Sequence, residues 1–338
     1  MGSVSPLLAI YEEIKRNDPD SEFLWVATRN GPESSLISEY NIPIKKIYSG
    51  KLRRYFSIKN FLDPFLIVIG FIQSFFLIIR FKPQAIISAG GFVSVPLVWA
   101  GFLLRRPSLI HQQDVISGLA NKLMAPFADI ITVTFKKSLD NFPKNKTALV
   151  GNPFRAEILN GNKQEAFNFF NLEPDLPVIL ITGGGTGALN INNLVLKSLN
   201  QLVNFCQIIH LTGGKIDQIA QHSRYHSFDF LTGQLKNAYA ASDLVVSRAG
   251  MSSLTELAAL RKPCIIIPIP ESHQEANAIE FGRNNAAIVL SEKKLDPDKF
   301  CNAIKELVFN KPEMENFRRN IAKLMPQDAA ARIAKMIL

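Results

Sequence analysis

The amino-acid sequence predicts an α/β protein with two doubly wound domains, each built on a parallel sheet. Short runs rich in Ile and Val alternate with helical patterns almost throughout, and these runs do not alternate apolar with polar residues. Such runs are typical of strands buried on both faces, and the intervening helices imply parallel sheets covered on both sides. The pattern is interrupted once, at the polar stretch 151–166, and then restarts. We therefore predict domains over 1–152 and 153–327, with a last helix at 328–338 that packs back on the first domain.

The first predicted element is a helix. Ser5 can cap it, Pro6 suits its first turn, and apolar residues at helical spacing continue it to Ile14. The strands expected in the first domain are 22–28, 43–48, 84–88, 108–111, 129–133 and 147–151. Those expected in the second are 178–182, 206–212, 229–232, 243–247, 264–268 and 286–290. Two such domains facing each other would place a ligand cleft at the carboxyl ends of their strands.

Charge and cysteine content narrow the class of protein. A net charge of +9 over 338 residues favours an anionic partner, which leaves nucleic acid, phosphate-bearing small molecules and an acidic membrane face open. The three cysteines lie far apart and form no CxxC, which argues against a disulfide framework or a zinc site and favours a reducing cytoplasm. Glu12, Glu13 and Lys15 interrupt the first helix, so it does not have the pattern of a secretory signal.

The most apolar segment is FLIVIGFIQSFFLII, residues 65–79. It is shorter than the roughly 20 residues needed to span a bilayer, and it contains Gln73 and Ser74. Two interpretations remain open from the residues alone. The segment is either a buried crossover helix or a helix that lies against a membrane surface.

Two glycine-rich turns follow predicted strands. ITGGGTGALN, 181–190, runs from a strand through glycines into a helix, where free N–H groups favour phosphate. The same residues match GxGxxA, but the second strand ends at 210–214 without the acidic residue that a nicotinamide-cofactor domain requires. A tight turn without a ligand is the third interpretation. ISAGGFVSVP, 87–96, repeats the geometry in the first domain and could hold a second phosphate-bearing substrate.

Two further stretches carry polar side chains after predicted strands. Within 247–278, Glu256 falls in the first turns of a helix, where it could accept hydrogen bonds from a ribose diol or act as a capping group. We expect His273, Gln274 and Asn277 on a polar loop that leads into a helix, and the amide of Gln274 suits the hydroxyls of a sugar. In 109–123, His111 ends a strand and could be a general base, a phosphate contact or a hydrogen-bonded structural histidine.

Taken together and in this order, SAGGFVSVP, HQQD, VGNPFR, GGGTGALN, SRAG and HQEANA resemble the MurG family of bacterial glycosyltransferases. The resemblance runs from Val4 essentially to the end of the chain. It implies the GT-B fold of two facing Rossmann-like domains, and an inverting, metal-independent transfer with no cofactor. The implied reaction moves N-acetylglucosamine from UDP-N-acetylglucosamine to undecaprenyl-pyrophosphoryl-muramoyl-pentapeptide, converting lipid I to lipid II in peptidoglycan synthesis. It implies no nucleic-acid partner.

The resemblance implies that the second domain binds the donor. Arg155 corresponds to the family's arginine in the nucleotide site, Glu256 would hold the ribose and Gln274 the sugar. Thr232 matches the position whose backbone meets the uracil, and Asp114 stands where the family has Asn. The full donor set implied is Arg155, Gly184, Gly185, Thr186, Thr232, Met251, Ser252, Ser253, Leu254, Thr255, Glu256, Gln274 and Asp114.

The first domain is implied to take the lipid acceptor, with Gly2, Gly90 and Gly91 facing its pyrophosphate. The segment 45–59 carries six basic residues and no acidic one, and it precedes the apolar segment 65–79. Both suit an anionic membrane surface. The expected location is therefore the cytoplasmic face of the cell membrane, with the protein bound peripherally.

The chain departs from the family pattern at its amino end. The family begins with a strand and a GGTGGH loop, whereas here only GSVSP precedes the helix, and Ser3 stands at the position of the family's proposed basic histidine. A serine cannot act as a base unaided at neutral pH, which leaves His111 as the first candidate base and Asp114 as the second. The absent strand is normally central, so we expect an unpaired gap in the first sheet, and either a longer natural chain or weakened acceptor chemistry. A related glycolipid transferase and a catalytically impaired UDP-sugar-binding scaffold remain as alternatives.

Overall fold

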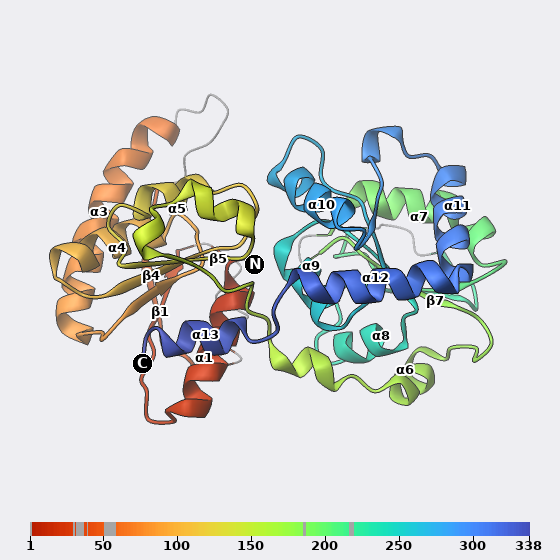
Figure 1. Ribbon diagram of the computed structural model, residues 1–338, viewed down its shortest axis with the longest axis horizontal. Coiled ribbons are helices and arrows are strands. Elements are labelled where there is room, and N and C mark those ends of the chain that lie inside the picture. Colours follow the sequence, from red (N-terminus) through yellow and green to blue (C-terminus); the bar gives the residue numbers. More distant parts are fainter. Residues whose placement is uncertain are drawn as a thin grey trace. The chain divides into compact units, whose positions relative to one another are not determined.

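The structure is a computed structural model with two compact units (Figure 1). It describes residues 2–29, 31, 37–38, 40–50, 59–184, 187–215 and 220–338, without the side chains of 59–62 and 64. Unit 1 comprises Met1–Phe154 and Gln327–Leu338, and unit 2 comprises Arg155–Pro326. The division thus falls close to the break expected from the polar stretch at 151–166.

Unit 1 contains two separate parallel sheets. Strands β1 (Trp25–Thr28) and β2 (Ile44–Ile47) pair with each other, and β3 (Ile86–Ser88), β4 (Ser108–Gln112), β5 (Ile130–Val133) and β6 (Thr147–Leu149) pair in that order. The helices are α1 (Val4–Asn17), α3 (Lys59–Phe81), α4 (Ser94–Leu103), α5 (Leu119–Met124) and α13 (Ala329–Lys335). Two 3-10 helices, η1 (Lys136–Asn141) and η2 (Lys144–Lys146), lie between β5 and β6.

The two ends of the chain meet in unit 1. α13 packs against α1, and Ile333 joins Ile10 and Ile14 in one apolar cluster beside the four-stranded sheet (Figure 1). α1 begins at Val4 rather than after a Ser5 cap, and Pro6 lies in its first turn as expected.

Unit 2 has one continuous six-stranded parallel sheet in the order β12-β11-β10-β7-β8-β9. Its strands are β7 (Val178–Thr182), β8 (Gln207–Leu211), β9 (Tyr225–Phe228), β10 (Leu244–Ser247), β11 (Cys264–Ile266) and β12 (Ile288–Val289). Its helices are α6 (Lys163–Phe170), α7 (Leu189–Leu202), α8 (Leu235–Ala241), α9 (Met251–Ala259), α10 (His273–Arg283), α11 (Pro297–Phe309) and α12 (Lys311–Leu324), with short 3-10 helices η3 (Ala156–Asn160) and η4 (Glu292–Lys294). All five residues of β7 are buried, because β10 and β8 flank it and helices cover it.

Two sequence predictions are wrong in unit 2. The expected strand at 229–232 is a bend and turn, and the strand is β9, which lies just before it. β9 is at the sheet edge and pairs only with β8, so His226 and Ser227 stay half-buried and the apolar pattern is absent. His273, Gln274 and Asn277 lie within α10 rather than on a loop, because Ser272 accepts from the Gln274 N–H and caps the helix.

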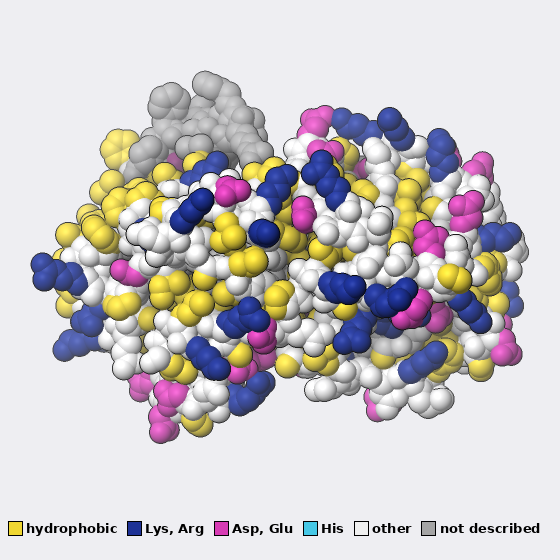
Figure 2. All heavy atoms as spheres, in the orientation of Figure 1, with side chains coloured by type: hydrophobic (Ala, Val, Ile, Leu, Met, Phe, Trp, Pro, Cys, Tyr) yellow, Lys and Arg dark blue, Asp and Glu magenta, His cyan; other side chains and the backbone are white. Residues whose placement is uncertain are grey.

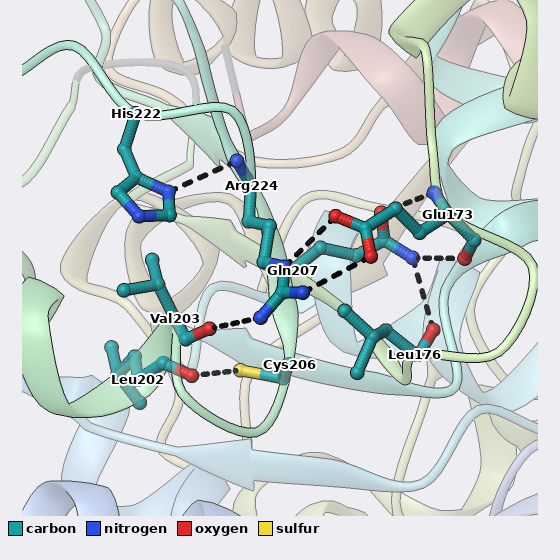
Figure 3. A network of polar contacts seen from close by, with 8 residues as sticks. All are labelled: Glu173, Leu176, Leu202, Val203, Cys206, Gln207, His222 and Arg224. Atoms are coloured by element: carbon teal, nitrogen blue, oxygen red, sulfur yellow. Dashed lines mark hydrogen bonds and ion pairs between the residues drawn. The ribbon is translucent and has the colours of Figure 1, made fainter.

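The amino ends of the unit 2 strands are closed by a polar network (Figure 3). Arg224, which precedes β9, donates from Nε and Nη2 to the two carboxylate oxygens of Glu173 and from Nη1 to the Val203 carbonyl. Gln207, at the start of β8, donates to the Glu173 and Leu176 carbonyls and accepts from the Glu173 N–H. These bonds tie the segment before β7 to β8 and β9, and they leave the opposite, carboxyl edge for ligands.

Candidate functional site

The candidate donor residues in unit 2 come from loops at the carboxyl edge of its sheet. β11, β10 and β7 are neighbouring parallel strands, with Thr182 opposite Ser247 and Ser247 opposite Ile266. The segments that follow these strands therefore lie side by side. They are the glycine loop before α7, the turn into α9 and the turn into α10 (Figure 1).

The glycine loop after β7 requires its glycines for backbone reasons. Gly184 and Gly187 have φ values of 78° and 66°, which side chains rarely adopt. A Cβ on Gly183 would lie 2.5 Å from the backbone nitrogen of Ala188, whereas one on Gly184 would meet open space. The glycine at position 183 thus lets the backbone pass close to the start of α7. Gly185 and Thr186, both predicted donor residues, lie outside the described residues.

The turn into α9 is held by buried polar side chains. Arg248 forms an ion pair with Glu292 and donates to the carbonyls of Ile267 (3.1 Å) and Pro268 (3.3 Å) after β11. Asn277 of α10 is fully buried and donates to the Ala249 carbonyl over 3.1 Å. Together these contacts join the β10, β11 and α10 segments and fix where α9 begins at Met251.

Glu256 lies on α9 with Tyr239 of α8 as its partner. The Tyr239 hydroxyl donates to Oε2 of Glu256 over 3.1 Å. Burial raises the pKa of Glu256, while the charge of Arg155 opposes that shift. Arg155 is itself ion-paired with Glu157 at 2.8 Å. The structure therefore brings together two predicted donor residues, Glu256 and Arg155, at one place in unit 2.

The other predicted donor residues of α9 differ in how deeply they are buried. Ser252 and Ser253 are half-buried in its first turn, whereas Met251, Leu254 and Thr255 are buried. Thr255 donates back to the Met251 carbonyl over 2.6 Å. The two serines, the N–H groups of the first turn and half-buried Glu256 are therefore the part of α9 that a ligand can reach.

Gln274 lies in the first turn of α10, and Thr232 lies in the segment between β9 and α8. Gln274 is half-buried, and its Oε1 accepts from the Ile269 N–H over 3.2 Å, which ties the turn after β11 to α10. Thr232 is exposed in the turn after β9, and its carbonyl accepts from the Leu235 N–H over 3.4 Å at the start of α8. Thr232 thus lies just before α8, the helix whose Tyr239 donates to Glu256.

In unit 1, the predicted acceptor glycines lie directly after β3. Gly90 and Gly91 have φ values of 94° and 95°, so this turn depends on glycine at both positions. A Cβ on Gly91 would lie 3.9 Å from the Ser3 hydroxyl, and one on Gly90 would lie 3.6 Å from Oδ1 of Asn121. The structure therefore places Ser3 beside the glycine turn. Gly2 precedes it in an exposed turn.

Two amide side chains support this turn, and sequence reasoning assigned no contact to either. Gln113 donates to the Ala89 carbonyl over 3.0 Å, and Asn121 donates to the His111 carbonyl over 3.1 Å. Within the described residues, Gln113 Oε1 and Asn121 Oδ1 are buried without a hydrogen-bond partner. Gln113 lies in HQQD and Asn121 in SGLANKL, two motifs that sequence analysis had singled out. No rule of residue spacing, however, predicts that these amides contact the Ala89 and His111 carbonyls.

His111 has the environment of a structural histidine. It is fully buried, its Nδ1 lies 3.0 Å from the Thr132 hydroxyl, and its Nε2 lies 2.8 Å from Oδ1 of Asn152. Burial lowers its pKa to about 4, against the hydrogen bond to Asn152. Each ring nitrogen therefore has a side-chain partner within hydrogen-bond distance in this arrangement. Asp114 is half-buried three residues later, and its carbonyl accepts from the Gln112 side chain over 2.8 Å.

The apolar segment 65–79 is part of α3, and its outer face is exposed. Gly70, Ser74 and Ile78 are buried on the side that packs against the rest of unit 1. On the other side Phe65 is 71% exposed and Phe76 64% exposed. The expectation of a buried crossover helix is wrong for this face. No helix in the described part of the chain is both long enough and apolar enough to cross a membrane.

Among residues 2–29, 59–184, 187–215, 220–338 and the short described pieces between them, no three His, Cys, Asp or Glu side chains gather as a metal site would require. The three cysteines are buried and free, and burial raises the pKa of Cys206 and of Cys264 to about 12.

Comparison with known proteins identifies the family. The model of the glycosyltransferase family 28 N-terminal domain matches residues 1–133, and that of the C-terminal domain matches residues 178–333. The chain is 39% identical over 91% of its length to a protein of Bacillus thuringiensis strain Al Hakam, of which it covers 89%. That relative is named UDP-N-acetylglucosamine–N-acetylmuramyl-(pentapeptide) pyrophosphoryl-undecaprenol N-acetylglucosamine transferase 3. The chain belongs to the MurG family.

Two further matches agree with this membership. A Clostridium botulinum transferase whose name differs from the first only in lacking its number is 38% identical, with 95% of the chain and 90% of the relative covered. The crystal structure of Acinetobacter baumannii MurG aligns with a TM-score of 0.74 at 24% identity, covering 99% of this chain and 95% of that one. The fold is therefore GT-B, as the sequence resemblance implied.

Proposed function

We propose that this chain transfers N-acetylglucosamine from UDP-N-acetylglucosamine to undecaprenyl-pyrophosphoryl-muramoyl-pentapeptide, which converts lipid I to lipid II. It is a UDP-N-acetylglucosamine-dependent hexosyltransferase of peptidoglycan synthesis. The observation that carries the proposal is identity of 36–39% over at least 91% of the chain to transferases with that reaction in their name. Unit 2 would bind the donor and unit 1 the lipid acceptor.

The polar groups at the carboxyl edge of unit 2 support the donor assignment. The start of α9 presents the N–H groups of its first turn and a positive dipole end, which favour a diphosphate. Glu256 would accept hydrogen bonds from ribose hydroxyls, and the hydrogen bond from the Tyr239 hydroxyl would orient its carboxylate. Arg155 adds a positive charge on the same side. Gln274 and the backbone of Thr232 would contact the sugar and the uracil.

The donor assignment is tested by UDP-N-acetylglucosamine binding. Replacing Glu256 by Gln keeps the shape but weakens the bonds accepted from the ribose, so we expect affinity to fall about tenfold in calorimetry. Glu315→Gln, an exposed carboxylate on α12, is the matched control and should leave affinity unchanged. Equal affinities for the two variants would contradict the role given to Glu256.

The transfer step is tested by release of UDP in the presence of a lipid I analogue. We infer that His111 serves structure rather than acting as the base, so His111→Gln should lower stability more than it lowers the turnover of the folded enzyme. Donor binding without any UDP release would instead favour a UDP-sugar-binding scaffold. Release with other acceptors only would favour a related glycolipid transferase.

An anionic membrane surface is the further partner that we propose for unit 1. Exposed apolar side chains cover the outer face of α3 and continue onto α4, where Phe102 and Leu103 are 55% and 61% exposed. Figure 2 shows hydrophobic side chains gathered over these helices, with Lys and Arg side chains at their margin. Exposed Arg105 follows α4, and exposed Lys45 and Lys46 lie on β2. Such a combination favours the surface of an anionic bilayer. Lys51, Arg53 and Arg54 of the predicted basic segment lie outside the described residues.

Vesicle sedimentation tests the surface. Phe65→Ser combined with Phe76→Ser should reduce binding to vesicles that contain phosphatidylglycerol by about tenfold, since each change removes an apolar side chain from the interface. Phe309→Ser on α11 of unit 2 is 57% exposed and serves as the matched control. Binding that is lost equally in the control, or unchanged in the double variant, would contradict the proposal.

A further inference from the structure

Tyr239 of α8 is buried inside unit 2 and has a carboxylate as its hydrogen-bond partner. The residue is 2% exposed. Its hydroxyl donates to Oε2 of Glu256 on α9 over 3.1 Å. A buried hydroxyl that loses its partner is unfavourable, because no water replaces the lost hydrogen bond. Any rotamer that moves Glu256 away from Tyr239 is therefore disfavoured, and the carboxylate stays where α8 holds it.

The proton of this hydrogen bond belongs to Tyr239. Burial raises the pKa of Tyr239 well above its usual value of 10, and the negative charge of Glu256 raises it further. The phenol therefore keeps its proton and donates, while Glu256 accepts. A carboxylate can accept about four hydrogen bonds through its two oxygens. With one of these taken by Tyr239, Glu256 still has acceptor sites for the two hydroxyls of a ribose.

Opposing influences act on the charge of Glu256. Burial raises its pKa, the charge of Arg155 and the hydrogen bond from Tyr239 lower it, and the charge of Glu157 raises it. The charge of Arg155 is shared, because Arg155 also pairs with Glu157 over 2.8 Å. Tyr239 and Arg155 therefore both favour the ionised carboxylate, and Tyr239 does so through a hydrogen bond.

α12 is another charged helix that packs against α9. Its Arg318 pairs with Glu315 on the same helix and acts on Lys262, which lies beyond the end of α9. Burial lowers the pKa of Lys262 to about 8 against the charge of Asp243, and the charge of Arg318 lowers it as well. The charge of Arg318 therefore acts past the end of α9, whereas Glu256 lies within the helix.

We propose that Tyr239 is a positioning residue for donor recognition: its hydroxyl holds the Glu256 carboxylate ionised and in place for the ribose, and so gives the site its preference for a ribonucleotide over the 2′-deoxy form. The inference rests on the proposed function, in which Glu256 binds the ribose of UDP-N-acetylglucosamine. It adds that a buried side chain with no substrate contact sets both the sugar selectivity and the pH below which the donor is lost.

Binding of two donors measures the selectivity. Tyr239→Phe removes the hydroxyl and keeps the ring, so the packing of α8 is retained. Calorimetry compares UDP-N-acetylglucosamine with its 2′-deoxyribose analogue, and we expect the ratio of the two affinities to fall about fivefold in Tyr239→Phe, because Glu256 is then free to turn away from the ribose. Tyr225→Phe is the matched control, since Tyr225 is also buried in unit 2 and its hydroxyl lies 2.8 Å from Nδ1 of His210. An unchanged ratio in Tyr239→Phe, or an equal fall in the control, would overturn the proposal.

The pH dependence of donor affinity separates positioning from structural support. The donor itself has no group that titrates between about pH 5 and pH 8, because its diphosphate is esterified at both ends. A protonated Glu256 accepts fewer hydrogen bonds, so affinity falls as the pH drops through the pKa of Glu256. Without the hydrogen bond from Tyr239 that pKa rises, and we expect the midpoint of the loss to move up by about 1 pH unit in Tyr239→Phe. Lower affinity or stability with an unmoved midpoint would show a purely structural role and would overturn the proposal.

Titration of Glu256 in the donor-free protein keeps a failure of this inference separate from a failure of the proposed function. The carbon NMR signal of its carboxyl group is identified by its absence from Glu256→Gln. Tyr239→Phe should move the midpoint of this signal to higher pH, and Tyr225→Phe should leave it unchanged. If this shift is found and no donor binds, the proposed function is wrong and the effect of Tyr239 on Glu256 stands. If the donor binds and no midpoint moves, the proposed function stands and this inference is wrong.

Discussion

The two units of this protein share one arrangement of strands and differ at the centre of the sheet. In unit 2 the central strand β7 is fully buried and pairs on both sides, and one apolar cluster joins it to α7 and α11. In unit 1, β1 and β3 belong to separate sheets, and an apolar cavity of about 520 Å³ lined by both strands lies there, which we call the β1–β3 slot. Separate apolar clusters surround Leu8 and Ile10 of α1. The comparison teaches that the strands on either side of the centre, β1–β2 and β3–β6, stay paired among themselves although β1 and β3 do not pair with each other. The reason is that each of the two sheets is covered by its own helices.

The difference predicts unequal sensitivity to the same core substitution. Ile181→Ala in β7 removes a fully buried side chain from a continuous core, and we expect it to cost about 4 kcal/mol of unfolding free energy. Ile87→Ala in β3 changes a half-buried residue at the slot and should cost about 1 kcal/mol. Urea unfolding followed by circular dichroism measures both. Similar losses would mean that the slot is not an open region in solution.

Substitutions at the carboxyl edge of the unit 2 sheet should lower the free energy of unfolding and donor binding more than substitutions at its amino edge. Arg248→Met removes one partner of the buried pair with Glu292, so we expect a loss of about 3 kcal/mol and weaker donor binding. Arg224→Met acts on the exposed pair with Glu173 and should cause a smaller loss, with donor binding unchanged. Unfolding and calorimetry on the two variants compare the edges directly. A larger loss of stability and of donor binding in Arg224→Met than in Arg248→Met would contradict the assignment of the carboxyl edge as the side that binds the donor.

One buried histidine in each unit should make a similar contribution to pH dependence. Burial lowers the pKa of His111 and of His210 to about 4, from 6.5. As the pH falls, each histidine is therefore protonated in the unfolded chain before it is protonated in the folded one. The stability that each neutral histidine contributes is present above pH 6.5 and is lost as the pH falls toward 4. We expect each histidine to account for about 2 kcal/mol of loss between pH 7.5 and pH 5.

The single variants separate the two contributions. His111→Gln and His210→Gln should each remove about 2 kcal/mol from the difference between urea unfolding at pH 7.5 and at pH 5. A difference that remains unchanged in His111→Gln would show that unit 1 opens before its histidine is protonated. That outcome would sharpen the contrast between the units.

Family membership, the GT-B fold and the proposed reaction were all within reach of the sequence, because motifs and unalternated apolar runs are local properties. The strand expected at 229–232 was wrong, since an edge strand such as β9 needs no apolar run on both faces. The sequence also could not predict the hydrogen bond from Tyr239 to Glu256 or the one from Asn277 to the Ala249 carbonyl. Each depends on which helices lie next to the turn into α9.

By itself, the sequence determined the class of fold, the order of the elements and the turns that need glycine, because hydrophobic period and backbone conformation act over a few residues. It also predicted a gap in the first sheet, through resemblance to the family. Only the tertiary structure decided that this gap is an apolar slot between β1 and β3 and that His111 is buried between Thr132 and Asn152. It also decided that α3 exposes its outer face. The physical reason is that burial and pairing depend on contacts between residues far apart in the chain, which no local pattern specifies.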